Sequence, residues 1–454
     1  MLVGGIVAVL VAGCLRPEPS VVTTCPPPDV PRAELPVFSS RVLVGAYDPG
    51  APGNLRLLPG IRPPSVVSTE RPGDPARIDP ARSLLICDTR VVEDPERTWD
   101  LGPRGNPRGV WTAGHLLSGL AREAGQDLDR FVRDWLEQWS AGDGAAGLPG
   151  DVMAAWLLRV WERGAPGARL TLEHAPFRLL AIVNRLDLIE AGNPEARLVF
   201  AALDEDGFPT DFTLNFEYVV SPVDVRAWAQ QWKDLDRHPL GSPRFNRALE
   251  RVTEQFTAGR PMRIRTNRAE GGARWELREF VFDGARLAPA PVKQTPPLDL
   301  RRDEELWTWV RYHAPEIGNG AHRIPERFPV SGRPFLALVA PMPPDDFWVA
   351  CFQDDCVPNP TRHLLALATC NGCHSLETFR RDERPFQHIR ARDRGLPAPL
   401  SPYLTGTEVP DPSGPDQPVL RFAELLRWRQ QMDEIVNPPR PYVSGRRGVS
   451  AFVH

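Results

Sequence analysis

Hydrophobic residues recur with a helical period in several segments of the chain. In the segment 127–139, Phe131, Val132, Trp135 and Trp139 are spaced one to four residues apart, so all four lie on one face of a helix. Such an aromatic stripe is typical of a helix packed on a core, and it is not evidence of a cofactor pocket. Helices are predicted in this way over residues 114–124, 127–139, 152–161, 223–235, 245–256 and 304–312.

Short apolar runs between turn residues predict β-strands. Asp204-Glu205-Asp206-Gly207 separates two of these runs and is typical of a hairpin turn. Strands are expected at 83–87, 177–188, 198–203, 212–220, 262–266 and 275–282, with shorter ones at 42–44 and 55–58. Helices and strands do not alternate as regular βαβ units, so the sequence predicts an α+β fold with a helical and mixed-sheet body.

The N-terminus predicts export. Residues 2–11 form an uncharged apolar run, which is too short to cross a bilayer but has the length of the apolar region of a signal peptide. The run ends in Val11-Ala12-Gly13-Cys14, which resembles the lipobox of bacterial lipoproteins. That resemblance implies a signal peptide over 1–14 and a lipid on Cys14 that anchors the chain to the outer membrane of the cell envelope. A leader without a lipid is the alternative, and the Pro-rich residues 15–40 predict an extended tether.

Charge and general motifs exclude some functions. The net charge is −4 and residues of both signs are interleaved, so the chain lacks the polybasic surface of proteins that bind nucleic acid. No dinucleotide-binding, P-loop, nucleophile-elbow or HExxH motif occurs. Residues 40–350 show no recognisable catalytic constellation, and whether the chain is an enzyme stays open.

The clearest chemical signal is Cys370-Asn371-Gly372-Cys373-His374. With seven Cys and nine His in 454 residues, chance would produce only about 0.002 copies of C-x-x-C-H. Two thiols three residues apart can bond the two vinyl groups along one edge of a haem, and the following His can bind the iron.

These five residues resemble the haem-attachment site of c-type cytochromes. The resemblance implies haem c bonded to Cys370 and Cys373, with His374 as an axial iron ligand. His388 and Met432 are the candidates for the sixth ligand, and a five-coordinate iron is also possible.

The resemblance also implies a small, loop-rich, mainly helical cytochrome c-like segment over 351–454, after a body at 41–350 that could divide near residue 168. Within the C-terminal segment, helices are predicted at 363–369, running directly into Cys370, and at 419–436. Asn359 and Pro360 predict the start of the first of these helices.

The cysteine spacing leaves other interpretations open. Cys351, Cys356, Cys370 and Cys373 could form a four-thiolate zinc site, although zinc thiolates are disfavoured where disulfides form. The spacing also allows a Cys351–Cys356 disulfide, and Cys25 could pair with Cys87. Cys370 and Cys373 could instead form a redox pair or a local disulfide.

Two functions therefore remain. In the first, an exported, membrane-anchored protein carries one haem c for electron transfer or redox sensing with a redox partner protein. In the second, a non-enzymatic envelope lipoprotein has a C-terminal Cys cluster that is stapled by disulfides or zinc. More broadly, the chain resembles uncharacterised bacterial lipoproteins in which Cys-Asn-Gly-Cys-His-x-x-Glu-Thr precedes a further His.

The haem and zinc interpretations predict different geometries. Haem requires an apolar concavity facing both thiols and His374, with walls predicted from Leu364, Leu367, Phe379, Phe386, Leu425 and Met432. A His374 packed solidly against its neighbours would count against haem. Convergence of all four cysteines on one point would indicate zinc.

Overall fold

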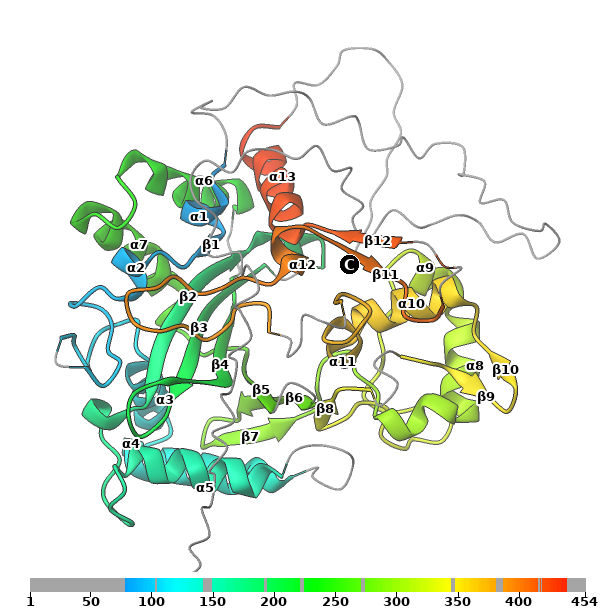
Figure 1. The fold of residues 1–454 in the computed structure, drawn as a ribbon, viewed down its shortest axis with the longest axis horizontal. Coiled ribbons are helices and arrows are strands. Elements are labelled where there is room, and N and C mark those ends of the chain that lie inside the picture. Colours follow the sequence, from blue (N-terminus) through cyan, green and yellow to red (C-terminus); the bar gives the residue numbers. More distant parts are fainter. Residues whose placement is uncertain are drawn as a thin grey trace, which may run out of the picture.

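A computed structural model describes residues 78–102, 104–141, 149–191, 194–220, 224–270, 274–343, 348–380, 387–414, 417 and 419–438. The predicted signal peptide, the lipidated Cys14, the tether and the strands at 42–44 and 55–58 lie outside these residues, as does Cys25. Within the described part, helices pack on an antiparallel sheet (Figure 1), so the predicted α+β class is confirmed. No helix in this part of the chain is both long and apolar enough to span a membrane.

One large antiparallel sheet organises the molecule. Its strands follow the order β1-β2-β3-β4-β5-β6-β7, and β8 also pairs with β6. The turn between β3 and β4 is the predicted hairpin, in which the side chain of Asp204 accepts hydrogen bonds from the backbone of Asp206 and Phe208. The strands are β1 (Leu85–Ile86), β2 (Phe177–Arg185), β3 (Glu195–Leu203), β4 (Pro209–Val219), β5 (Arg263–Glu270), β6 (Arg274–Phe282), β7 (Leu287–Ala290) and β8 (Val339–Pro341).

Helices cover one face of this sheet with aromatic side chains. Trp139, from the predicted aromatic stripe, stacks on Phe212 and Phe280 with ring centroids 5.5 and 5.7 Å apart. The body was predicted to divide near residue 168, but residues before and after this position belong to the same core. Its helices are α1 (Pro80–Ser83), α2 (Thr89–Val92), α3 (Ala113–Glu123), α4 (Leu128–Leu136), α5 (Gly150–Trp161), α6 (Val225–Lys233) and α7 (Pro243–Thr257), with 3₁₀ turns η1 (Glu137–Ser140), η2 (Leu172–His174), η3 (Leu186–Ala191) and η4 (Asp234–Arg237).

A second, smaller core lies beside the β6 end of the sheet. It contains Leu306, Phe335, Trp348 and Leu365, so its members come from both sides of the predicted boundary at 350. Its elements are η5 (Leu298–Arg302), α8 (Glu304–Tyr312), α9 (Ala314–Gly318), the hairpin β9 (Cys351–Phe352) and β10 (Asp355–Cys356), and α10 (Asn359–Ala368).

The C-terminal segment contains hairpins as well as helices. After α11 (Cys370–Cys373) and α12 (Pro402–Thr405), β11 (Thr407–Pro410) pairs with β12 (Val419–Phe422), and α13 (Glu424–Val436) follows. The helix predicted over 419–436 is therefore wrong in its first turn, because Val419, Leu420 and Phe422 pair as a strand, which suits β-branched and aromatic residues.

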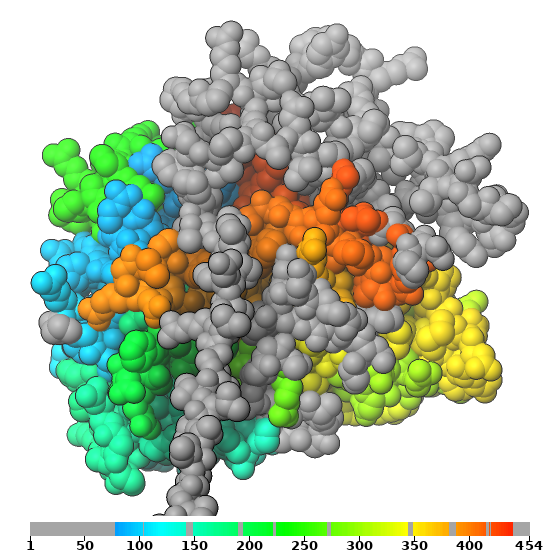
Figure 2. Space-filling model, viewed as in Figure 1, coloured from blue at the N-terminus to red at the C-terminus, as the bar shows by residue number. Residues whose placement is uncertain are grey.

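The same segment folds back over the body of the molecule. The orange stretch near residue 392 crosses the blue and green parts of the chain (Figure 2). There Arg392 forms an ion pair with Glu93, and its backbone carbonyl accepts a hydrogen bond from Arg178. Leu425, Trp428 and Met432 of α13 belong to the main core. The C-terminal residues are thus an integral part of one packed structure.

Asp236 is a destabilising carboxylate at neutral pH. Its side chain is 23% exposed and lies 3.7 Å from Arg82 Nε, and burial raises its pKa to about 6. The folded state therefore holds a proton that the unfolded state releases near pH 4, so stability is lost as the pH rises through about 6. We expect Asp236→Asn to raise the free energy of unfolding by about 1 kcal/mol at pH 7.5, after a discount for solvent screening.

Urea unfolding at pH 7.5 and pH 4.5 tests this expectation, because the gain at the lower pH should fall to roughly a third of its value at pH 7.5. Glu205→Gln is a matched control, since Glu205 and its partner Arg159 are both more than half exposed and such pairs contribute little. An equal effect of Asp236→Asn at both pH values would contradict the assignment.

Candidate functional site

The Cys-x-x-Cys-His segment forms one tight helical turn. Helix α10 ends at Ala368, and Thr369 caps the short helix α11, accepting a hydrogen bond from the backbone of Gly372 at 3.0 Å. Gly372 is required here because a β-carbon would lie 2.2 Å from the carbonyl oxygen of Ala366. Cys370 and Cys373 stand at the first and fourth positions of the turn, so they project from the same side of it.

A buried ionic network ties this turn to α10. The carboxylate of Glu377 is completely buried; it pairs with Arg362 and lies 2.5 Å from His363 Nδ1. Arg362 also donates to the carbonyl of Trp348 at 2.8 Å, and the Trp348 indole donates to the side chain of Asn371 at 2.8 Å. Glu377 therefore fixes the turn, and is not part of the face that the thiols present.

The four C-terminal cysteines are in two different states. Cys351 and Cys356 are bonded to each other, with an S–S distance of 2.02 Å, whereas Cys370 and Cys373 are free thiols. The predicted Cys351–Cys356 disulfide is thus present, and these two residues are not available to a four-thiolate zinc site. Among the described residues, no group of three or more His, Cys, Asp or Glu side chains is arranged to hold a metal ion.

The two cysteines are half-buried, and their thiols hold their protons. The backbone N–H of Cys370 donates to Thr295 Oγ1 at 2.8 Å, and its sulfur lies 3.7 Å from the carbonyl oxygen of Lys293. Burial raises the pKa of Cys370, and raises that of Cys373 to about 12. Neutral thiols are poor nucleophiles, so this environment does not resemble that of an activated thiolate in a thioredoxin-like enzyme.

Two imidazoles meet beside the thiols. The His374 ring stacks on Trp275 of β6 with centroids 4.4 Å apart and an interplanar angle of 12°. His388 contacts His374 with ring centroids 4.7 Å apart, and its Nε2 lies 3.8 Å from Cys373 Sγ. Burial, followed by the charges of His374 and Arg185, holds the pKa of His388 well below its usual value. His388 is therefore a neutral imidazole, the form that binds metals.

Of the two residues predicted as a sixth ligand, His388 is the one that lies beside His374. His388, and not Met432, contacts His374; Met432 is completely buried in the main core. Phe386 lies outside the described residues. The other walls predicted for a single apolar concavity fall in separate clusters, with Leu364 in the second core, Leu367 beside β11 and β12, and Leu425 in the main core. The side chains predicted to wall one apolar concavity are thus distributed over three hydrophobic clusters.

The donor set fits a c-type haem, but the present spacing of the rings does not. Two free thiols, the adjacent His374 and a neutral second imidazole are the groups that such a haem requires. An iron held between two imidazoles, with roughly 2 Å to each nitrogen, needs ring centroids roughly 6 Å apart, and the observed separation is 4.7 Å. The packing of His374 between Trp275 and His388 counts against a haem in this conformation. Stacking on Trp275 covers one face of the His374 ring. A metal would bond to a nitrogen at the edge of the ring, so this stack does not itself block a metal.

Charged strands form the floor of the site, and sequence reasoning missed them. Arg265 of β5 bonds to Glu217 at 3.1 Å and to Glu279 at 2.8 Å. Its positive charge lowers the pKa of Cys370 and is the largest influence on that pKa after burial, which raises it. Arg197 lies 2.5 Å from Glu195 and 3.2 Å from Glu217. Charged residues stand at every second position in parts of β3 and β4, which marks one polar face of the sheet, but this pattern is the same whether that face lies in water or is buried.

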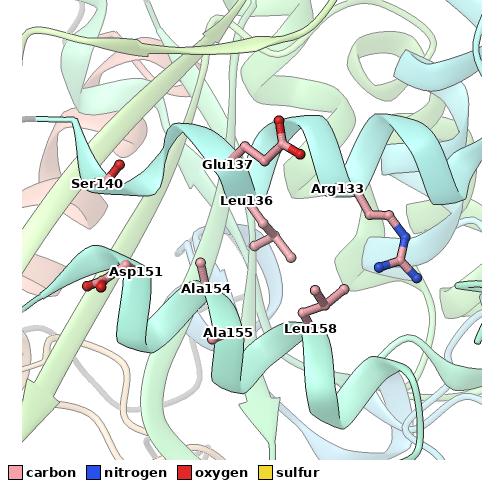
Figure 3. Close-up of a pocket in the computed structure, with 8 residues that line it drawn as sticks. All are labelled: Arg133, Leu136, Glu137, Ser140, Asp151, Ala154, Ala155 and Leu158. Carbon is pink, nitrogen blue, oxygen red and sulfur yellow. The ribbon is translucent and has the colours of Figure 1, made fainter. Parts of the chain in front are cut away.

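A separate cavity lies on the helical side of the molecule. It measures about 290 Å³ and opens between α4 and α5 (Figure 3). The residues lining it are Arg133, Leu136, Glu137, Ser140, Asp151, Ala154, Ala155 and Leu158. Because α4 packs on the aromatic face of the sheet and the thiols lie over the charged face, this cavity is not part of the Cys-His site.

Comparisons with known proteins identify no relative. No family model, curated protein or solved structure matches the chain. The function is therefore argued from the site alone.

Proposed function

We propose that this chain is an exported, lipid-anchored envelope protein that carries one covalent c-type haem for electron transfer or redox sensing. Cys370 and Cys373 would form the thioether bonds, and His374 and His388 would be the axial ligands. The haem would supply a one-electron couple, exchanged with a redox partner protein.

A single observation carries the proposal. His388, which is 14 residues from His374 in sequence, lies against it in the fold, next to two thiols that remain free in a chain whose other C-terminal cysteines are bonded. His374 is not an ordinary surface residue, because it is only 8% exposed.

The surrounding residues have positioning roles. Trp275 orients the His374 ring by stacking. Ser401 Oγ lies 3.3 Å from His388 Nδ1, and the other ring nitrogen, Nε2, lies 3.8 Å from Cys373 Sγ; Nε2 would be the ligand atom. Haem binding requires His388 to withdraw from His374 by between one and two ångströms, by rough estimate from metal–imidazole distances.

The visible spectrum of the purified chain tests the proposal. Protein made in a host that matures c-type cytochromes should retain haem after denaturation and give a reduced c-type haemochrome. The double variant Cys370→Ser/Cys373→Ser should lose covalent haem completely, and the matched control Cys351→Ser/Cys356→Ser should keep it. A colourless protein in which both Cys370 and Cys373 can be alkylated would refute the proposal.

The second candidate is a non-enzymatic envelope lipoprotein with a disulfide-stapled tail. The Cys351–Cys356 bond and the buried Glu377 network favour it, because both stabilise structure without chemistry. Elemental analysis separates the candidates: one iron per chain supports haem, and a metal-free protein supports the stapled tail.

A further inference from the structure

A continuous row of aromatic rings passes through the Cys-His site. Trp275 stacks on His374, and His374 contacts His388. The row continues from His388 to Tyr403 of α12, with ring centroids 4.9 Å apart, and from Tyr403 to Phe422 of β12, at 5.0 Å. Tyr403 therefore links His388 to the β11–β12 hairpin.

Tyr403 contacts both kinds of chemical group in the site. Its ring leans on His388 at an interplanar angle of 40°, and its hydroxyl donates a hydrogen bond to the side chain of Cys373. Cys373 Sγ in turn lies 3.8 Å from His388 Nε2. The three side chains thus contact one another pairwise, so a rigid tyrosine fixes where the sulfur and the imidazole lie relative to each other.

The tyrosine is held in place by its own packing. Its ring packs against the main core and also against the cluster formed by Val409, Leu420 and Phe422. The next residue of α12, Leu404, is buried. A side chain packed between two clusters is restricted in the rotamers it can adopt, and this is what a positioning residue requires.

Backbone hydrogen bonds fix the chain at His388, but they do not set how its ring is turned. The N–H of Ser401 donates to the carbonyl of His388 at 2.9 Å, and the N–H of Arg390 donates to the carbonyl of Pro399 at 2.9 Å. The orientation of the imidazole depends on side chains: Ser401 Oγ lies beside Nδ1, and Tyr403 contacts the ring.

We propose that Tyr403 is a positioning residue of the Cys-His site, whose ring holds the His388 imidazole and whose hydroxyl holds the Cys373 sulfur. What the site binds rests on the function proposed above, whereas both contacts of Tyr403 belong to the haem-free chain. In the haem-bearing form, the same ring would keep His388 in place as a ligand.

Two substitutions separate the ring from the hydroxyl. Tyr403→Phe keeps the ring and removes the hydroxyl, whereas Tyr403→Leu removes both. We expect the NMR signal of the Cys373 β-carbon to shift in both variants. The signals of the His388 ring should shift clearly only in Tyr403→Leu, because only that change removes the neighbouring aromatic ring. Tyr218→Phe is the matched control: Tyr218 is 2% exposed and contacts Phe256 in the main core, so neither signal should move.

The measurement uses the full chain, labelled in its cysteine and histidine side chains and made in a host that cannot attach haem. An unmoved Cys373 signal in Tyr403→Phe would overturn the role of the hydroxyl, even if Tyr403→Leu does not fold. His388 signals that shift equally in Tyr403→Phe and Tyr403→Leu, or in neither, would overturn the role of the ring.

The haem-bearing form gives a separate result. There, Tyr403→Leu should convert part of the iron from low-spin to high-spin, and Tyr403→Phe should not. Iron that stays low-spin in both variants would show that Tyr403 does not hold a ligand. A chain that never acquires haem would refute the function proposed above and leave the NMR result unaffected.

Discussion

Glu377→Ala is expected to lower the free energy of unfolding by about 3–5 kcal/mol, because it leaves a buried guanidinium without its main partner. Arg362 has only 6% of its side chain exposed, and a second carboxylate, Asp411, lies 3.6 Å away. His363 would lose its 2.5 Å contact as well. The destabilisation should be largest around α10 and the Cys-x-x-Cys-His turn.

Urea unfolding followed by tryptophan fluorescence measures the effect, and hydrogen exchange locates it. Glu408→Ala is the control, because its pair with Arg421 is exposed and should contribute at most about 1 kcal/mol. Glu377→Gln separates charge from shape: it should destabilise less than Glu377→Ala if hydrogen bonding carries part of the effect. Loss of less than 1 kcal/mol in Glu377→Ala would show that the network does not hold the turn.

The helices and most strands could be predicted because their patterns are local. Trp135 and Trp139 repeat with the period of a helix, and both are buried on the sheet where that period places them. The failure at 419–422 has a physical reason, since Val419 to Phe422 pair with β11, a partner nine residues or more away. A short apolar run cannot reveal such a partner.

The site could be predicted in part, for the same reason. Cys370, Cys373, His374 and His388 lie within one short stretch of sequence. Trp275, which stacks on His374, comes from β6 almost one hundred residues earlier, and only the sheet brings it there. No local pattern marks it.

The charged floor was missed because charge was treated as a sign of exposure. Glu217 alternates with Phe216 and Tyr218 along β4, which is the usual pattern of a strand with one face in water. In the fold both faces are covered, and Glu217 is completely buried. Ion pairing with Arg197 and Arg265 is what permits this burial.

The thiols and the charged floor belong to one environment. The charges of Arg265 and Glu279 shift the pKa of Cys370, and the charge of Arg185 shifts the pKa values of both Cys373 and His388. Any redox group held by the two cysteines would therefore lie next to fixed charges, which shift its reduction potential.

In the haem-bearing form that we propose, His388→Ala is expected to convert a six-coordinate, low-spin iron into a high-spin form and to shift the reduction potential on the order of 100 mV, because axial ligands dominate that potential. His388 is the expected ligand since it contacts His374 and is neutral. Covalent attachment should survive, as both thiols remain.

Met432→Leu is the matched control for this substitution. Met432 is completely buried within the main core, so exchange for a side chain of similar volume should cost less than about 1.5 kcal/mol of stability and leave the absorbance spectrum unchanged. Visible absorbance in the oxidised and reduced states, together with a potentiometric titration, distinguishes the two variants. A spectrum altered by Met432→Leu but not by His388→Ala would make Met432 the ligand. If neither substitution changes it, the iron is five-coordinate or bound by another group, and the role assigned to the His374–His388 contact is wrong.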